Sequence, residues 1–331
     1  MPNLTDFLPT ATAVTARRVI DGALELSVVG SFTRLGPAVR RHLFEWQSDP
    51  GQDLTDATVV VTGANSGLGF ATAEALATRG AAVVMVARSR ERGERAAAEL
   101  AERVGDDCFT VFEADLSDLV AVARVGREIA DQHGELRALI HNAGALSAER
   151  KISPQGHELS FASMVLGPQL LTHCLLDALD ADAGRCIWVT SGGMYTQRLH
   201  LDDLEMASGY RGSVAYARAK RAQVDLVAEW ATRHDGVTSF HATHPGWAAT
   251  PGVSDSLPTF DRLLGPALRT PAEGCDTTTW LVGAPQGQAT TGLLWFDRQP
   301  RSVARLPRTA SSPQTRARLW DIVEDMIDLT K

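Results

Sequence analysis

Two residues of the chain have the types and the spacing of an acid–base pair. Tyr216 and Lys220 lie four positions apart in the segment YARAK, so on a helix both side chains share one face. A tyrosine phenol has a pKa of about 10, too high for ready proton exchange at neutral pH. A nearby ammonium lowers that pKa, so the pair could give a proton to a substrate oxygen. This spacing is common, and its meaning depends on the elements around it.

A glycine-rich segment, TGANSGLG at residues 62–69, could bind a phosphate group. It follows an apolar run that predicts a buried strand, and an alanine-rich helix follows it. Glycines allow the backbone to approach a pyrophosphate closely, and the free N–H groups at the helix N-terminus hold its negative charge. The expected nucleotide contacts in this segment are Gly63, Asn65, Ser66, Gly67, Leu68 and Gly69.

The end of the next predicted strand indicates which nucleotide binds. A site for NAD needs an acidic side chain about twenty residues past the glycines, where it accepts hydrogen bonds from the ribose hydroxyls. This strand ends instead in Ala87 and Arg88. A guanidinium offers a fork of donors to a 2′-phosphate. The sequence therefore predicts NADP(H) as the cofactor.

Strand-like and helical patterns alternate along most of the chain. The strand candidates are apolar runs at 58–62, 82–87, 109–114, 138–142, 186–190, 238–243 and 292–296. Continuous apolar runs are typical of strands buried on both faces of a parallel sheet. Their alternation with helices predicts an α/β fold, a Rossmann-type doubly wound sheet of about seven strands with helices on both faces.

Three segments follow from this pattern: an N-terminal helical extension (1–52), an NADP-binding catalytic domain (53–300) and a C-terminal tail whose last helix docks on the body (301–331). The extension mixes apolar and basic residues. It could touch a membrane surface as an amphipathic helix, or pack on its own domain or on a partner subunit. We favour packing, and membrane contact stays open.

Composition narrows the function classes. The 331 residues are 44% hydrophobic and 22% charged, as in ordinary globular proteins, and the net charge of −8 argues against nucleic-acid binding. The four cysteines lack metal-ligand spacing, so no metal is expected, and free thiols favour a reducing compartment. The N-terminus has no long apolar run. We therefore expect a cytoplasmic protein, with a homo-oligomer possible.

The motifs, taken in order, resemble those of the short-chain dehydrogenases/reductases over about residues 55 to 300. Besides the glycine segment and YARAK, these are EADLSD, HNAG, VTSGG and HPGWAATPG. The resemblance implies that Ser191, Tyr216 and Lys220 are catalytic. It also implies cofactor contacts from Asp115, Leu116, Asn142, Ala143, Gly144, Tyr216, Lys220, Pro245, Gly246 and Thr250. The stretches SGGM, YARAKRAQV, HPGWAATPGV and WFDRQP are similar to one subgroup of that family.

Two positions depart from the family pattern. Met164 stands where the family usually has an asparagine that supports a water chain to the lysine, and a thioether cannot replace an amide as donor and acceptor. His141 replaces the first asparagine of NNAG, where we expect it to tune the cofactor pocket.

The segments that cover the nicotinamide in the resembling fold are apolar here. The expected substrate pocket contains Met164, Met194, Tyr195 and Trp247. We therefore expect an NADP(H)-dependent oxidoreductase that interconverts a carbonyl and an alcohol on a hydrophobic small molecule. The alternative is a cofactor-binding regulatory or scaffold protein of the same fold with weak or no turnover. An epimerase or dehydratase is a weaker alternative, because its glycine segment is spaced differently.

Overall fold

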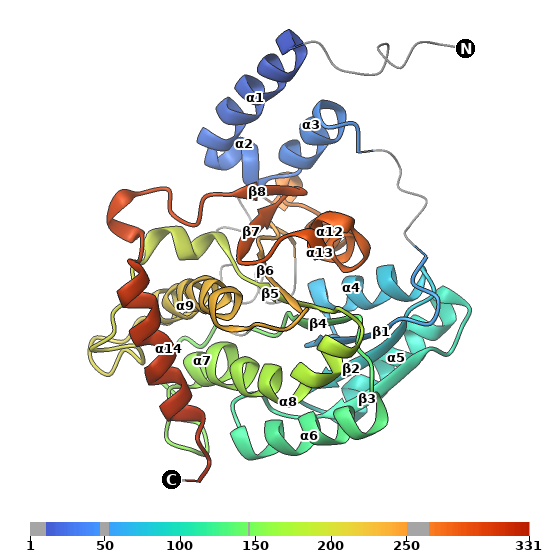
Figure 1. Ribbon diagram of the computed structural model, residues 1–331, viewed down its shortest axis with the longest axis vertical. Coiled ribbons are helices and arrows are strands. Elements are labelled where there is room, and N and C mark those ends of the chain that lie inside the picture. The colour runs from blue at the N-terminus through green and yellow to red at the C-terminus, as the bar shows by residue number, and fades with distance from the viewer. Residues whose placement is uncertain (1–10, 47–52, 145, 250–264, 331) are drawn as a thin grey trace.

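A central eight-stranded sheet organises the molecule (Figure 1). The computed structural model describes residues 11–46, 53–144, 146–249 and 265–330. The strands lie in the order β3-β2-β1-β4-β5-β6-β7-β8, and all neighbours are parallel except β7 and β8. Their bounds are β1 Thr58–Thr62, β2 Ala82–Ala87, β3 Phe109–Glu113, β4 Ala138–His141, β5 Arg185–Val189, β6 Ser239–Thr243, β7 Leu293–Phe296 and β8 Gln299–Arg301. This order confirms the predicted doubly wound sheet.

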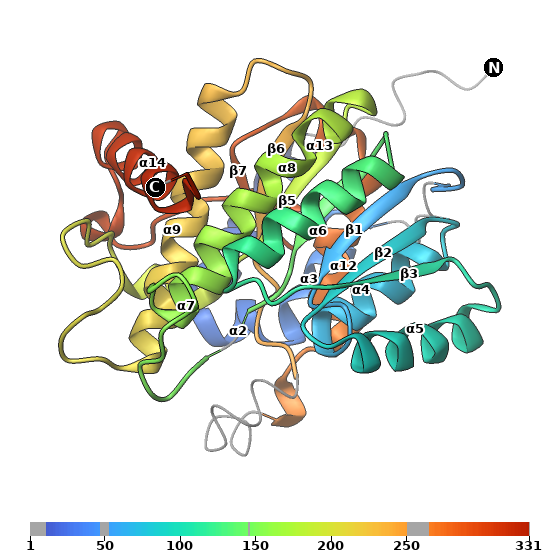
Figure 2. The same ribbon diagram turned by 90° about the horizontal axis from the view of Figure 1, so that it is seen from below.

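Helices cover both faces of the sheet (Figure 2). One layer contains α4 (Gly67–Ala77), α5 (Arg90–Val104) and α12 (Pro271–Gly283), and the other contains α6 (Leu119–Gln132), α8 (Gly167–Ala181) and α9 (Gly212–Arg233). Alternate strand residues face opposite layers: Val60 joins the core under α6, α8 and α9, whereas Val59 and Val61 join the core under α4 and α12. This double burial is why the central strands β1, β2 and β4 consist mainly of apolar residues.

One helical stretch among the described residues, 159–181, is long and apolar enough to cross a membrane. It comprises α7 (Leu159–Phe161), a π-helical turn η2 (Ala162–Leu166) and α8. In the fold, 67% of the most apolar part of this stretch is buried, and α8 packs against α6 and β4. The apolar character of this stretch is therefore accounted for by its place in the core.

The eighth strand, β8, was not predicted. It pairs antiparallel with β7 through a tight hairpin in which Asp297 and Arg298 both have positive φ, 51° and 55°. Two consecutive left-handed residues are the geometry of the hairpin turn whose twist suits paired strands. Pro300 lies on this edge strand, where a missing N–H is tolerated.

The described part of the N-terminal extension, residues 11–46, contains three helices: α1 (Ala11–Leu26), α2 (Val28–Phe32) and α3 (Leu35–Leu43). They lie outside the sheet, above β8 in Figure 1. Their docking face combines polar and apolar side chains, because Asp21, Arg40 and Phe32 are buried whereas Val19, Ile20 and Leu26 are exposed. The apolar pattern of the extension therefore does not mark the side that packs on the domain.

The C-terminal helix α14 (Pro313–Ile327) packs on the main body, against α9 and α8. Leu319, Trp320, Val323 and Ile327 are buried in this contact. The Trp320 ring meets that of Trp230 edge to face, with 4.9 Å between centroids.

Candidate active site

The glycine-rich turn between β1 and α4 brings backbone donors to the carboxyl edge of the sheet. Gly63 and Gly67 have positive φ angles of 67° and 57°, which favour glycine. A Cβ atom at Gly69 would lie 2.3 Å from the Gly63 carbonyl oxygen, so only glycine lets α4 begin this close to the turn. Ser66, the N-cap of α4, makes no side-chain capping bond within the described chain. The helix N-terminus therefore fits a bound phosphate.

Arg88 lies at the edge of this turn. The Gly63 N–H donates to the carbonyl oxygen of Val86 (2.8 Å), two residues before Arg88. The Arg88 side chain is exposed and forms no ion pair with any residue the structure describes. The side chain of the next residue, Ser89, caps helix α5, where it accepts a hydrogen bond from the Arg92 N–H (3.4 Å). The Arg88 guanidinium is thus the group of this strand end that fits a second phosphate.

Residues 142–144 connect the glycine turn to the predicted catalytic lysine. The Thr62 hydroxyl oxygen accepts from the N–H groups of Asn142 (3.0 Å) and Ala143 (3.1 Å), and the Asn142 amide donates to the Thr62 carbonyl (3.0 Å). A Cβ atom at Gly144 would lie 3.4 Å from Nζ of Lys220. A nucleotide that spans from the glycine turn to Lys220 would therefore pass along this segment.

Asp115 stabilises the loop after β3. Its Oδ1 accepts from the Ser117 N–H (2.9 Å) and hydroxyl (2.8 Å), and Leu116 between them is buried. On the other side of the site, Gly246 follows β6 with a φ of 73°, and its N–H donates to Nδ1 of His244 (2.9 Å). Thr250 lies outside the described residues.

The structure brings the three predicted catalytic side chains together. Ser191 follows β5, whereas Tyr216 and Lys220 come from α9. The Ser191 hydroxyl lies close enough to the Tyr216 phenol to favour its ionised form. Lys220 donates from Nζ to the Val189 carbonyl (2.8 Å), and Nζ lies 5.6 Å from the centre of the Tyr216 ring. This is the arrangement that proton donation to a substrate oxygen requires.

Burial controls the protonation of both α9 side chains in the free protein. It raises the pKa of the Tyr216 phenol, an effect that the nearby Ser191 hydroxyl opposes, and it lowers the pKa of Lys220 to about 7. The expected lowering of the phenol pKa by an ammonium is therefore not the dominant influence in this state. Lys220 instead has a pKa suited to exchanging a proton near neutral pH.

Met164 and His141 are both buried near Lys220. Met164 lies in the π-helical turn η2, and its carbonyl accepts from the Gln223 amide (2.7 Å). His141 contacts the Thr172 hydroxyl through Nε2 (2.8 Å), and that hydroxyl already donates to the Pro168 carbonyl. His141 Nε2 must therefore carry the proton. Burial, with a contribution from Lys220, lowers the pKa of His141 to about 3, so the ring is neutral.

The four residues expected to line a substrate pocket are partly or fully buried, and they pack against neighbouring residues of the fold. Met194 is fully buried beside Thr190, and the Tyr195 hydroxyl donates to the Ser302 carbonyl (3.3 Å). The Trp247 N–H donates to the Phe32 carbonyl (2.8 Å). Substrate contact by Met164, Met194, Tyr195 and Trp247 stays a prediction, and Phe32 is a neighbour that no sequence motif indicated.

Comparison with known proteins agrees with this geometry. The family model described as short chain dehydrogenase matches residues 57–258. The chain belongs to the short-chain dehydrogenase family. Dehydrogenase/reductase SDR family member 12 of Bos taurus is 38% identical over 81% of this chain and 85% of its own length, which confirms the subgroup indicated by SGGM and YARAKRAQV. Retinol dehydrogenase 14 of Homo sapiens is 32% identical over 98% of this chain and 100% of its own length.

A solved structure described as a short chain dehydrogenase of Escherichia coli CFT073 complexed with NADPH has a TM-score of 0.62 and 26% identity. The match covers 76% of this chain and all of that one. As a short-chain dehydrogenase, the protein is an oxidoreductase with a nicotinamide nucleotide cofactor and a small-molecule substrate.

Proposed function

We propose that this short-chain dehydrogenase uses NADP(H) to interconvert a carbonyl and an alcohol on a hydrophobic small molecule. The observation that carries the proposal is the cluster of Ser191, Tyr216 and Lys220 at the same sheet edge as the glycine turn and Arg88. The apolar side chains of Met194 and Trp247 and the relatives named retinol dehydrogenase support a hydrophobic substrate.

The bound nucleotide supplies or accepts the hydride in such a reaction, and the protein's own groups manage the oxygen and the proton. In reduction, the Ser191 hydroxyl donates a hydrogen bond to the carbonyl oxygen and stabilises its growing negative charge. The Tyr216 hydroxyl, which lies beside Ser191, donates its proton to that oxygen. Lys220, with a pKa of about 7 in the free protein, can then return a proton toward the phenolate.

The test combines turnover and nucleotide binding. NADPH consumption with a panel of apolar ketones and aldehydes should identify a substrate, and Tyr216→Phe should then lower kcat at least about 100-fold, the scale of acid–base catalysis. The ring remains, so the NADPH dissociation constant should change less than about threefold, well under 1 kcal/mol. Tyr210→Phe is the matched control, because the Tyr210 hydroxyl bonds to Glu158 (2.9 Å) away from Ser191. Full activity of Tyr216→Phe would show that another group is the acid.

One observation favours the second candidate, a cofactor-binding regulatory protein with weak or no turnover. Met164 is buried beside Gly144, with its sulfur 3.3 Å from where a Cβ atom of Gly144 would lie, and supplies no side-chain donor for a water chain to Lys220. Tight NADPH binding without consumption across the panel would support this candidate.

A further inference from the structure

Within the described residues, the N-terminal extension reaches the active site through the side chain of Phe32, the last residue of α2. Phe32 is buried against the two turns that follow β5 and β6. Its ring lies 4.5 Å from the His244 ring and 5.6 Å from the Trp247 ring, edge to face in both cases. A Cβ atom at Gly192 would lie only 2.8 Å from Cε2 of Phe32. Phe32 therefore packs directly on the residue that follows the catalytic Ser191.

The backbone of Phe32 is fixed to the same turns. The Phe32 carbonyl accepts from the Trp247 N–H (2.8 Å) and from Nε of the buried Arg269 (3.0 Å). Arg269 also donates to the Ser31 carbonyl (2.7 Å), and the Arg34 N–H donates to the Ala267 carbonyl (3.0 Å). These bonds leave the ring little freedom to move away from Gly192.

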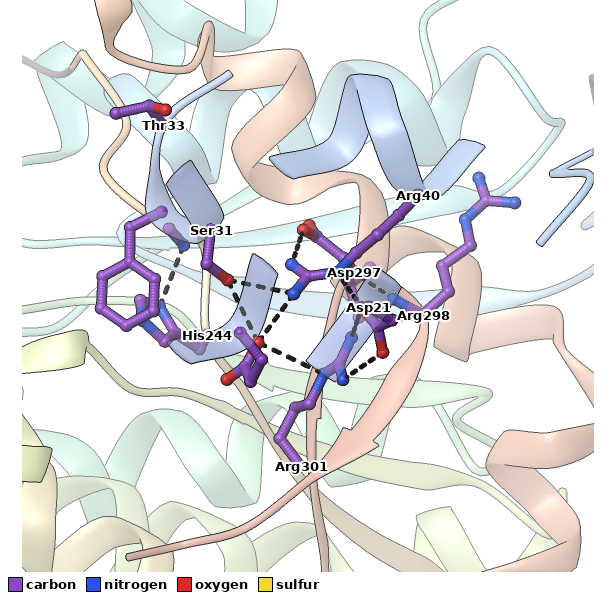
Figure 3. Close-up of polar contacts among 12 residues, drawn as sticks. Asp21, Ser31, Thr33, Arg40, His244, Asp297, Arg298 and Arg301 are labelled. Atoms are coloured by element: carbon purple, nitrogen blue, oxygen red, sulfur yellow. Dashed lines mark hydrogen bonds and ion pairs between the residues drawn. The ribbon is translucent and has the colours of Figure 1, made fainter. Parts of the chain in front are cut away.

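A buried ionic network then holds the extension in this position (Figure 3). Arg40 has no exposed side-chain surface and pairs with Asp21 (2.7 Å), Glu25 (2.7 Å) and Asp297 (2.6 Å). Asp297 pairs in turn with Arg269 (2.6 Å). A buried ion pair is a poor source of net stability but costs much when one partner is lost, so such a network can select one arrangement over others.

We propose that Phe32 is a positioning residue, through which the extension holds the Ser191–Gly192 turn against the turn at residues 244–247. An extension that only attached itself to the body would not need a ring between two active-site turns. The effect on turnover rests on the proposed function, whereas the holding of the turns can be measured without any substrate.

Hydrogen–deuterium exchange measures the holding directly. Phe32→Ala removes the ring, so the amides of Met194, which bonds the Ser191 carbonyl (3.0 Å), and of Trp247 should exchange at least about tenfold faster. Leu35→Ala, in the same extension with an exposed side chain, is the matched control and should leave both amides at the wild-type rate. Unchanged exchange at these amides in Phe32→Ala would overturn the proposal.

Kinetics test whether this holding serves catalysis. On the substrate found in the panel, Phe32→Ala should lower kcat about tenfold or more at a temperature where it is fully folded, with the NADPH dissociation constant within about threefold of wild type. Phe32→Leu should recover part of the loss, which a role in overall stability alone would not produce. Unchanged kcat would overturn the proposal, even with faster exchange.

Two further results separate this inference from the proposed function. Should Phe32→Ala fail to fold, the milder Phe32→Leu is measured by the same exchange experiment, where faster exchange supports the proposal and unchanged exchange overturns it. Should the wild-type protein turn over no carbonyl compound, the proposed function fails, and exchange at Met194 and Trp247 still decides whether Phe32 holds the turns.

Discussion

Arg88 is the residue on which the proposed preference for NADPH rests. It is exposed at the end of β2, beside the glycine turn, and no acidic side chain occupies the strand end. Hydrogen bonds to charged groups contribute about 1.5–3 kcal/mol. We therefore expect NADPH to bind more tightly than NADH, and Arg88→Ala to reduce the ratio of the two affinities by about tenfold to a hundredfold.

Fluorescence titration with both nucleotides measures this ratio. Arg95→Ala is the matched control. Arg95 is an exposed arginine of α5 that pairs with Glu91, so this substitution removes one positive charge at a different position from Arg88. Equal affinity of the unmodified protein for NADPH and NADH would refute the assignment of Arg88.

The site residues that could be predicted from the sequence are those that lie close together along the chain. The glycine turn and the Tyr216–Lys220 pair are each local patterns, so the sequence shows their chemistry before any fold is known. Phe32 and Arg269 could not be found in this way. Their bond joins positions 237 residues apart, and neither lies in a motif. The protonation of Lys220 also escaped prediction, because burial sets it.

Helix α3 is held by a buried charge. Arg40 on α3 is fully buried among Asp21, Glu25 and Asp297. Arg40→Met keeps much of the side-chain volume but leaves buried carboxylates without this partner. We expect the free energy of unfolding to fall by about 3–5 kcal/mol, the usual cost of breaking a buried pair.

Urea unfolding measures the loss, and Arg17→Ala supplies the comparison within the same extension. Arg17 pairs with the exposed Glu45, so its removal should cost about 0–1 kcal/mol. Similar small losses in both variants would show that the Arg40 network does not hold the extension in place.

At the same scale, the central strands of the sheet were predictable because burial on both faces makes them mainly apolar. β8 was not, since it has only three residues, includes Pro300, and is created by the Asp297–Arg298 turn rather than by its own pattern. The side of α1 that packs on the domain could not be predicted from the sequence either. Its buried Asp21 gains a partner only when Arg40 and Arg301 arrive from elsewhere in the chain.

For the whole molecule, three buried histidines link stability to pH. Burial lowers the pKa of His141 to about 3 and of His241 to about 4, and it holds the pKa of His244 well below its usual range, with Arg269 contributing. In the unfolded chain these groups protonate near pH 6.5. Their folded pKa values are depressed, so the stability they contribute is present above pH 6.5 and is lost as the pH falls toward 4.

We expect the free energy of unfolding to fall between pH 6.5 and 5 by up to about 4 kcal/mol per pH unit, since the unfolded chain binds up to three more protons. Urea unfolding across this range tests it. His141→Asn should remove about a third of the slope, whereas Thr172→Val, which loses the same hydrogen bond without a titrating group, should keep the slope. A flat profile in the wild-type protein would contradict the expectation.

The Arg40 network also constrains the order in which the chain can fold during synthesis. Arg40 bonds to Asp297, 257 positions later, and Asp21 bonds to Arg301, 280 positions later. The helices α1 and α3 leave the ribosome before these partners and meet them only after residues 297 and 301 have emerged. Contacts of such long sequence separation form slowly and leave intermediates open to aggregation. During synthesis, the extension therefore stays undocked until β7 and β8 have formed. Until then its charged groups lack these partners, and Val19, Ile20 and Leu26 are exposed as they are in the folded protein.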